Sequence, residues 1–310
     1  MTAVSIRVVF LGTAASIPTD ARSLPSMAVK RKNEVLLFDC GEGAQRQMIR
    51  ARVGFHKKMK VFVSHMHGDH VLGLPGLLQT MSLLDRRQKL EVYGPVGLKA
   101  FVEAIEQTVQ FVLTFPVEIH EVEDEGIVCE EKEYYVHAVR ANHVIPSFSY
   151  ALVEKPRPGR FNPKRAKALG VAEGPLWSKL QHGETVKIKG GKLIKPEQVL
   201  GPLRQGIKIA YSGDTRPTKS LVKLAEGADL LIHEATLADD LLERALEDGH
   251  STPSQAAKTA KKAKVKRLVL THVSSRYRDA QPLLEQARKI FQNTGVAEDF
   301  MLVELQASDV

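Results

Sequence analysis

The stretch from Ser64 to His70 concentrates side chains that bind metal ions. It reads Ser-His-Met-His-Gly-Asp-His and places three imidazoles and one carboxylate at positions 65–70. Borderline metals such as zinc take neutral imidazole and carboxylate ligands together. His65 and His67 are two positions apart, so they can share a metal from an irregular loop but not from one helical face. Asp69 and His70 would point elsewhere, which predicts a second metal; the alternative is a polar loop whose histidines occur by chance.

The same arrangement of an apolar strand followed by polar side chains recurs along the chain. The run Val61-Phe62-Val63 precedes the histidines, and Leu74, Leu77, Leu78, Met81 and Leu84 follow at helical spacing. Four later apolar runs lead to further candidate side chains, namely His143, Asp214, Glu234 and His272. Strands that alternate with helices predict stacked α and β layers, and loops at one end of such layers collect catalytic groups. A lone histidine at a strand end is more often structural, but the joint pattern favours one shared site.

Composition bounds the function only loosely. The 310 residues are 43% hydrophobic, enough for a sizeable core, and the net charge of +8 favours a polyanionic partner such as nucleic acid. The two cysteines, Cys40 and Cys129, form no CxxC motif, which favours a reducing compartment over a disulfide scaffold. The first strand begins near Ile6 without a long apolar segment, so we expect a cytoplasmic protein with no membrane contact.

A basic excursion interrupts the strand pattern between Val153 and Ile207. Residues 155–167 hold six basic side chains and no acidic one, and their three prolines and one glycine oppose a continuous helix. We expect residues 154–185 to form an exposed arm that contacts phosphates, and residues 186–194 to form a hairpin turned at Gly190-Gly191. The alternative is a solvated basic loop without a partner.

The pattern HxHxDH resembles the signature of the metallo-β-lactamase superfamily. That resemblance implies a four-layer αββα sandwich in the α/β class, with a hydrolytic site for one or two metals along one edge. Over nearly its full length the chain also resembles the tRNase Z (ribonuclease Z) family, in its short form. The stretches that carry this resemblance are Phe10-Leu11-Gly12-Thr13, Phe38-Asp39-Cys40-Gly41-Glu42-Gly43, Ser64 to His70, Ser212-Gly213-Asp214-Thr215, His233-Glu234-Ala235-Thr236, His250-Ser251-Thr252 and Thr271-His272.

The family resemblance implies roles for these residues within one catalytic domain that spans 1–310. Two zinc ions per subunit would be held by His65, His67 and His143, by Asp69, His70 and His272, and by Asp214 as the bridge. Asp69 would also orient the attacking water, and Glu234 with His250 would protonate the leaving oxygen. Precursor tRNA would be the substrate, and the enzyme would be a homodimer. The substrate-binding candidates are Lys155, Arg157, Arg160, Lys164, Arg165, Gly174, Pro175 and Arg276; Gly174-Pro175 matches the family's arm motif.

Two other functions remain open at this point. A superfamily hydrolase of small esters, such as an arylsulfatase or a cyclic-nucleotide phosphodiesterase, would use the same metals but gives the basic arm no role. An RNA-binding protein with a decayed metal site is the other alternative, although every ligand position holds a competent residue. The remaining histidines, His56, His120, His137 and His182, are expected to be ordinary.

Overall fold

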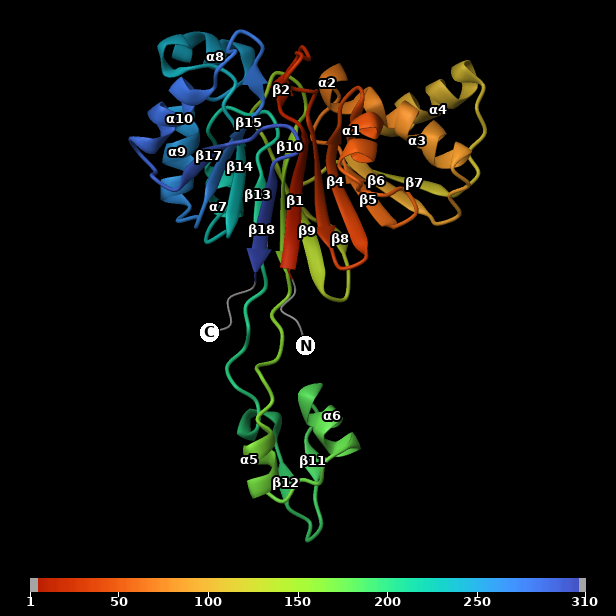
Figure 1. The fold of residues 1–310 in the computed structure, drawn as a ribbon, viewed down its shortest axis with the longest axis vertical. Helices are drawn as coiled ribbons and strands as arrows, with labels where there is room; N and C mark the ends of the chain where they lie inside the picture. Colours follow the sequence, from red (N-terminus) through yellow and green to blue (C-terminus); the bar gives the residue numbers. More distant parts are fainter. Residues whose placement is uncertain (1–4, 307–310) are drawn as a thin grey trace. The chain divides into compact units, whose positions relative to one another are not determined.

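The computed structural model describes residues 5–306, and these divide into two compact units. The main unit comprises residues 5–153 and 207–306, and the small unit comprises residues 154–206. The main unit is built from two seven-stranded sheets with helices on their outer faces (Figure 1). The predicted four-layer αββα sandwich is therefore confirmed.

The first sheet and its helices come from the N-terminal half of the chain, except for one strand. Its strand order is β18-β1-β3-β4-β5-β6-β7. The strands are β1 (Ser5–Gly12), β3 (Ser26–Arg31), β4 (Glu34–Cys40), β5 (Lys58–Phe62), β6 (Leu90–Pro95), β7 (Val117–Val122) and β18 (Leu302–Gln306). The helices are α1 (Ala44–Arg50), α2 (Gly68–Val71), α3 (Gly73–Leu83) and α4 (Leu98–Val109).

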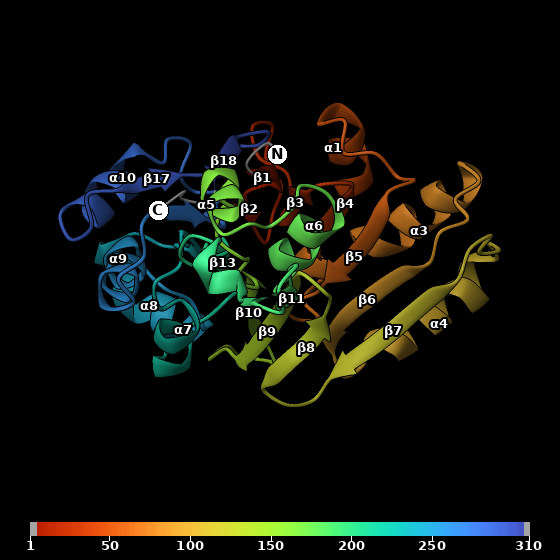
Figure 2. The same ribbon diagram turned by 90° about the horizontal axis from the view of Figure 1, so that it is seen from below.

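The second sheet has the order β17-β15-β14-β13-β10-β9-β8. Its strands are β8 (Gly126–Glu130), β9 (Tyr134–Arg140), β10 (Phe148–Glu154), β13 (Lys208–Tyr211), β14 (Leu230–Glu234), β15 (Leu268–Thr271) and β17 (Thr294–Val296). Its helices are α7 (Lys219–Leu224), α8 (Leu242–Asp248), α9 (Pro253–Lys262) and α10 (Gln281–Arg288), with a 3-10 turn η2 (Asp239–Leu241) before α8. Figure 2 shows the strands of both sheets from below.

Three apolar layers hold the main unit together. Leu37, Val61 and Leu77 belong to the core between the first sheet and its helices, and Leu231 and Ala260 belong to the core between the second sheet and its helices. Aromatic rings fill the space between the sheets. The pairs of rings with centroids 5.2–6.1 Å apart include Phe38–Phe62, Phe62–Tyr150 and Phe38–Tyr211. Strands buried on both faces read as continuous apolar runs, which is why their ends were visible in the sequence.

The small unit has a core of its own. Its elements are α5 (Pro163–Ala168), α6 (Pro175–Gln181), β11 (Val186–Lys187), β12 (Leu193–Ile194) and the 3-10 turn η1 (Pro196–Gln198). The expected hairpin is present, because Val186 pairs with Ile194 and the two turn glycines adopt positive φ. Ala166, Leu180 and Val199 pack in one buried cluster with these strands. The compact unit thus includes the hairpin and the returning chain beyond residue 185.

Candidate active site

The ends of four strands bring the candidate metal ligands of the main unit together. The chain passes from β5 to His65 and from β9 to His143, while Asp214 and His272 follow β13 and β15. A backbone hydrogen bond from Phe148 N to Ser64 O, 2.9 Å long, ties the end of the first sheet to the second. Parallel pairing of β13, β14 and β15 aligns the ends of those strands at one edge. Side chains more than 200 positions apart therefore share one site.

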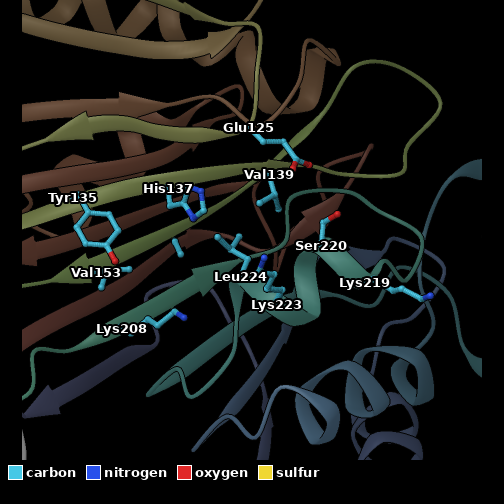
Figure 3. Close-up of a pocket in the computed structure, with 11 residues that line it drawn as sticks. Glu125, Tyr135, His137, Val139, Val153, Lys208, Lys219, Ser220, Lys223 and Leu224 are labelled. Carbon is cyan, nitrogen blue, oxygen red and sulfur yellow. The ribbon is translucent and has the colours of Figure 1, made fainter.

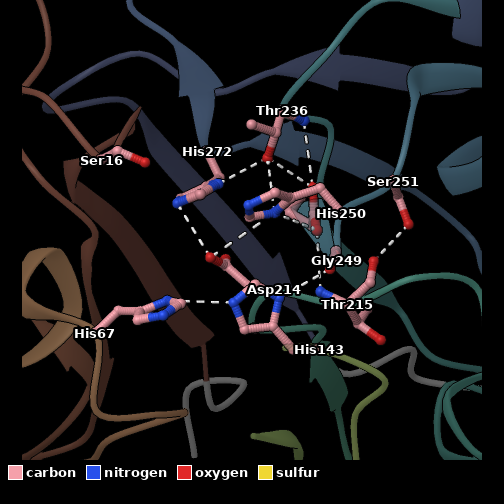
Figure 4. Close-up of polar contacts among 12 residues, drawn as sticks. Ser16, His67, His143, Asp214, Thr215, Thr236, Gly249, His250, Ser251 and His272 are labelled. Atoms are coloured by element: carbon pink, nitrogen blue, oxygen red, sulfur yellow. Dashed lines mark hydrogen bonds and ion pairs between the residues drawn. The ribbon is translucent and has the colours of Figure 1, made fainter. Parts of the chain in front are cut away.

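One group of nitrogen atoms comes from His65, His67 and His143. Nε2 of His65 lies 3.0 Å from Nδ1 of His67, and Nε2 of His143 lies 3.2 Å from the same atom. Figure 4 shows the His67 and His143 rings pointing toward each other. Their ligand atoms all lie within 4.8 Å of one another, so the three imidazoles form a candidate metal site.

A second group comes from Asp69, His70 and His272. The Nε2 atoms of His70 and His272 are 3.4 Å apart, and Oδ2 of Asp69 lies 3.5 Å from each. Asp214 lies between the two groups, with its Oδ2 3.3 Å from Nε2 of both His70 and His272 and 3.6 Å from Nε2 of His65. Asp214 is thus within reach of both groups of candidate ligand atoms.

Outer hydrogen bonds fix which ring nitrogen faces the centre of the site. Nδ1 of His143 lies 2.9 Å from Gly249 O and Nδ1 of His70 lies 2.8 Å from Oδ2 of Asp39. A carbonyl and a carboxylate only accept hydrogen bonds, so each Nδ1 carries the proton and each Nε2 turns a lone pair inward. Outer-shell partners of this kind set ligand tautomers in metal sites.

The donor set fits divalent metal ions. Inward lone pairs 3.0–3.4 Å apart repel each other unless a cation lies between them. Oδ1 of Asp214 is buried and has no hydrogen-bond partner, which a carboxylate tolerates when it ligates a metal. Burial lowers the pKa of His65 well below its ordinary value and keeps that ring in its neutral, ligating form. Burial also disfavours protonation of His70, but the carboxylates of Asp214 and Asp39 outweigh it and raise the pKa of His70.

Glu234 and His250 form an acid–base pair beside these ligands. Nδ1 of His250 lies 3.0 Å from Oε1 of Glu234, which is buried at the end of β14. Thr236 Oγ1 donates to Oε2 of Glu234 at 2.7 Å, and Thr215 N donates to Oε1 at 2.9 Å, so the carboxylate cannot turn away. Burial disfavours the charged ring of His250, but Glu234 outweighs it and raises the pKa of His250 to about 9. Nε2 of His250 is left to give a proton to a substrate.

Two contacts hold Asp69 and its loop in place. Ser16, a non-glycine residue with a positive φ of 57°, donates its backbone N–H to Oδ2 of Asp69 at 2.9 Å. The Ser16 loop is joined to the His272 loop by two short paired strands, β2 (Ala14–Ala15) and β16 (Val273–Ser274). Behind α2, a Cβ at Gly73 would lie 1.9 Å from Gly41 O, so glycine is required where α3 begins. The sequence pattern had indicated α3 but not these supports.

Several side chains that sequence reasoning did not select complete the site. Asp39 accepts hydrogen bonds from Ser64 N, Ser64 Oγ and Tyr211 Oη in addition to His70. Thr236 links Nδ1 of His272, at 2.8 Å, to Glu234. Asp39 and Thr236 lie within motifs that carried the family resemblance, but only the fold shows what they contact.

The predicted substrate-binding residues lie outside this cluster. Arg276 is exposed beyond β16, where its Nε lies 3.3 Å from Ser274 Oγ. The other candidates belong to the small unit, and they are Lys155, Arg157, Arg160, Lys164, Arg165, Gly174 and Pro175. Gly174 has a φ of 120° and precedes α6, which begins at Pro175. A helix begins here because proline suits its first turn and glycine suits the unusual backbone before it.

Comparisons with known proteins identify the fold and the family. Residues 180–273 match the beta-lactamase superfamily domain, and residues 6–156 match a family described as anti-Pycsar protein Apyc1. Among solved structures, human tRNase Z, short form, superposes with a TM-score of 0.71 and 33% identity, over 96% of this chain and 98% of that chain. The metallo-beta-lactamase fold protein YhfI from Bacillus subtilis superposes with a TM-score of 0.68 and 17% identity, over 97% of this chain and 100% of that chain. At this low identity the similarity supports the fold alone.

Curated relatives are more similar still. Ribonuclease Z of Methanosarcina acetivorans is 48% identical over 97% of this chain and 98% of its own length. Ribonuclease Z of Myxococcus xanthus is 49% identical over 98% of this chain and 99% of its own length. This similarity, together with the complete ligand set, excludes a binding protein with a decayed site and confirms a metal-dependent hydrolase. The resemblance found in the sequence is confirmed, and the chain belongs to the ribonuclease Z family.

Proposed function

We propose that the chain is a zinc-dependent endoribonuclease that removes the 3′ trailer from precursor tRNA. It would cleave after the discriminator base and leave a 3′-hydroxyl on the tRNA and a 5′-phosphate on the trailer. The observation that carries the proposal is the position of Asp214 Oδ2 between two sets of metal ligands, 3.9 Å from the His250 ring. The similarity to human tRNase Z along nearly the whole chain supports tRNA as the substrate.

Two zinc ions per subunit would be held by the two groups of ligands. His65, His67 and His143 would bind one ion, Asp69, His70 and His272 the other, and Asp214 both. When bound, a pair of divalent ions stabilises the charge that develops on a phosphodiester and makes water a stronger acid. The histidine-rich donor set favours zinc over magnesium or calcium, which prefer oxygen ligands.

The chain's own side chains would carry the proton transfers. Asp69, held by the N–H of Ser16, orients the water that attacks phosphorus. As the bond from phosphorus to the 3′ oxygen breaks, the protonated His250 ring gives that oxygen its proton. Glu234 stabilises the imidazolium before the transfer and keeps the ring in place. The phosphate remains on the trailer, which accounts for both product ends.

The small unit would bind phosphates of the tRNA. Residues 154–206 contain twelve basic and four acidic side chains, a net charge of +8 that equals the net charge of the whole chain. The main unit, with 32 basic and 31 acidic residues, is therefore close to neutral. Because cations that neutralise phosphates dominate RNA affinity, we assign the arm function to this unit, with residues 154–185 as its predicted tRNA-binding part.

Removal of the small unit tests that role. The backbones of Glu154 and Gly206 are in contact, since a Cβ at Gly206 would lie 2.3 Å from Glu154 O. A short glycine-serine linker can therefore replace residues 155–205. This deletion removes β11 and β12 together, so neither strand is left without its partner. We expect the KM for precursor tRNA to rise strongly while hydrolysis of bis(p-nitrophenyl) phosphate stays near normal. Equal losses on both substrates would refute the assignment.

A homodimer in the cytoplasm belongs to the same proposal. The exposed apolar side chains Leu83 and Val112 support a partner surface, because contiguous exposed apolar patches mark association sites. Hydrogen bonds between Thr114 and Ser82 hold the two segments that carry them together. If the arm of one subunit serves the other's site, mixing an arm-deleted chain with an Asp214→Ala chain should restore activity. No helix within residues 5–306 has the length and apolarity needed to cross a bilayer.

Mapping of the cleavage products at single-nucleotide resolution tests the proposed reaction. Purified protein is incubated with a 3′-extended precursor tRNA, with and without a chelator. The expected result is one cut after the discriminator base, with a tRNA 3′-hydroxyl, and no cut in the chelated sample. An intact precursor alongside rapid hydrolysis of a small ester would instead support the small-ester hydrolase.

A further inference from the structure

A cavity of about 550 Å³ lies on the outer face of the second sheet, within the main unit. Its walls come from β9, β10, β13 and α7, so it is formed by rigid elements. Figure 3 shows Tyr135, His137 and Val139 following one another along β9, with Lys208 on β13, beyond the intervening β10, and Glu125 on the opposite side. A volume of this size is within the range of small-molecule sites.

The cavity combines an apolar floor with cationic walls. Val139, Ala151 and Leu224 are buried at its base. The ammonium groups come from Lys208, Lys219 and Lys223, whereas Glu125 contributes the one acidic side chain among the lining residues. This imbalance is local, because the main unit as a whole carries 32 basic and 31 acidic residues.

Two of these cations, Lys208 and Lys223, lie near His137, whereas Figure 3 shows the Lys219 side chain pointing away from both. Within residues 5–306, neither Lys219 nor Lys223 forms an ion pair, and Nζ of Lys208 donates to the carbonyl oxygen of Glu226 at 2.8 Å. Burial lowers the pKa of His137, and the positive charges of Lys208 and Lys223 lower it further. The carboxylate of Glu125 has the opposite effect and raises this pKa. Burial also lowers the pKa of Lys208. An anion in the cavity would relieve this repulsion between like charges.

The chemistry of the lining points to a ligand with both a phosphate and a flat ring. We propose that this cavity is a second binding site, separate from the metal ligands, for a nucleoside phosphate. Lys208 and Lys223 bind the phosphate, and the base lies against the apolar floor beside the rings of Tyr135 and His137. The nucleoside phosphate is either a free nucleotide or one nucleotide of an RNA strand.

Binding of adenosine 5′-monophosphate to the metal-loaded full chain tests the site. The variant Lys219→Ala/Lys223→Ala removes two exposed cations, and Lys261→Ala/Lys262→Ala on α9 is a control with the same charge change. We expect the Kd measured by calorimetry to rise about tenfold or more in the first variant and to stay unchanged in the control. Hydrolysis of bis(p-nitrophenyl) phosphate should be normal in both. An unchanged Kd in Lys219→Ala/Lys223→Ala, or no binding to the wild type, overturns the proposal.

Further probes separate the parts of the ligand and its sources. His137→Ala keeps all three lysines. It should therefore weaken binding of the monophosphate but leave binding of inorganic phosphate unchanged. If inorganic phosphate binds the wild type as tightly as the monophosphate, no nucleoside is recognised and the proposal fails. If the Lys219→Ala/Lys223→Ala variant binds a 5′-phosphorylated RNA tetranucleotide more weakly than the wild type does, an RNA strand is supported as the source. If only the binding of the monophosphate becomes weaker, a free nucleotide is supported.

Discussion

Asp39 is the residue through which we expect the outer shell to control metal binding. It is fully buried, and its Oδ2 lies 2.8 Å from Nδ1 of His70, 2.9 Å from Ser64 Oγ and 2.6 Å from Tyr211 Oη. In Asp39→Asn an amide NH₂ can occupy that position, where it faces three donors and accepts from none of them. The His70 ring can then reverse its tautomer, which puts a proton on the Nε2 that faces Asp214.

The structure gives the expected size of both effects. The reversed His70 ring accepts from the new amide at Nδ1, which leaves the Ser64 Oγ and Tyr211 Oη donors without their acceptor. At about 1–3 kcal/mol for each unpaired buried donor, Asp39→Asn should lower the unfolding free energy of the chelated protein by roughly 2–6 kcal/mol. Loss of an outer-shell partner typically costs about 10–100-fold in metal affinity, and we expect a loss in that range.

Tyr211→Phe is the matched control for this substitution. It removes one hydrogen bond to the same carboxylate but leaves His70 paired with Asp39. Its expected cost is about 1 kcal/mol of stability, with metal affinity close to that of the wild type. Urea unfolding in chelator measures the first quantity, and zinc competition with a chromophoric chelator measures the second. Equal zinc affinities in Asp39→Asn and Tyr211→Phe would refute the tautomer argument.

Three further predictions concern the site itself. His250→Ala should keep both metals, measured by elemental analysis, but lower cleavage of precursor tRNA by ~10²–10⁴-fold, the range for a lost general acid; near-normal turnover would remove His250 from the mechanism. Asp214→Ala should lower the metal content itself, and a full complement of metal would contradict its bridging position. In chelated protein the His250 ring should titrate by NMR with a pKa of about 9, because Glu234 favours its charged form, and Glu234→Gln should lower that pKa; an unchanged pKa would show that another group stabilises the imidazolium.

The candidate ligands were predictable because each signal is local in the sequence. An apolar run such as Leu268-Val269-Leu270 indicates a buried strand, and the polar residues after it indicate where the strand ends. The start of α9 is also marked locally, because Thr252 and Gln255 form a capping box there. When the immediate neighbours of a residue indicate its secondary structure, its place at a strand or helix end can be predicted without knowledge of the fold.

The outer shell was not predictable, because its contacts join distant segments. His143 lies 106 positions from the carbonyl of Gly249, and Tyr211 lies 172 positions from Asp39. A sequence gives no distance between such residues, even when both belong to recognisable motifs. The small unit shows the same limit, since its core comes from apolar residues scattered among basic ones, such as Ala166, Leu180 and Val199. Composition indicated a basic arm, but not that the compact unit continues to residue 206.

The distribution of charge gives a physical reason for separating catalysis from substrate binding. The metal ligands and the Glu234–His250 pair are fixed by strand ends in a unit with a net charge of only +1, whereas residues 154–206 carry a net charge of +8. Phosphate contacts made by flexible cations depend strongly on salt, while buried catalytic groups are screened much less. Added salt should therefore raise the KM for precursor tRNA steeply and change kcat little. With the small unit removed, most of that salt dependence should disappear, because the remaining unit has a net charge of only +1.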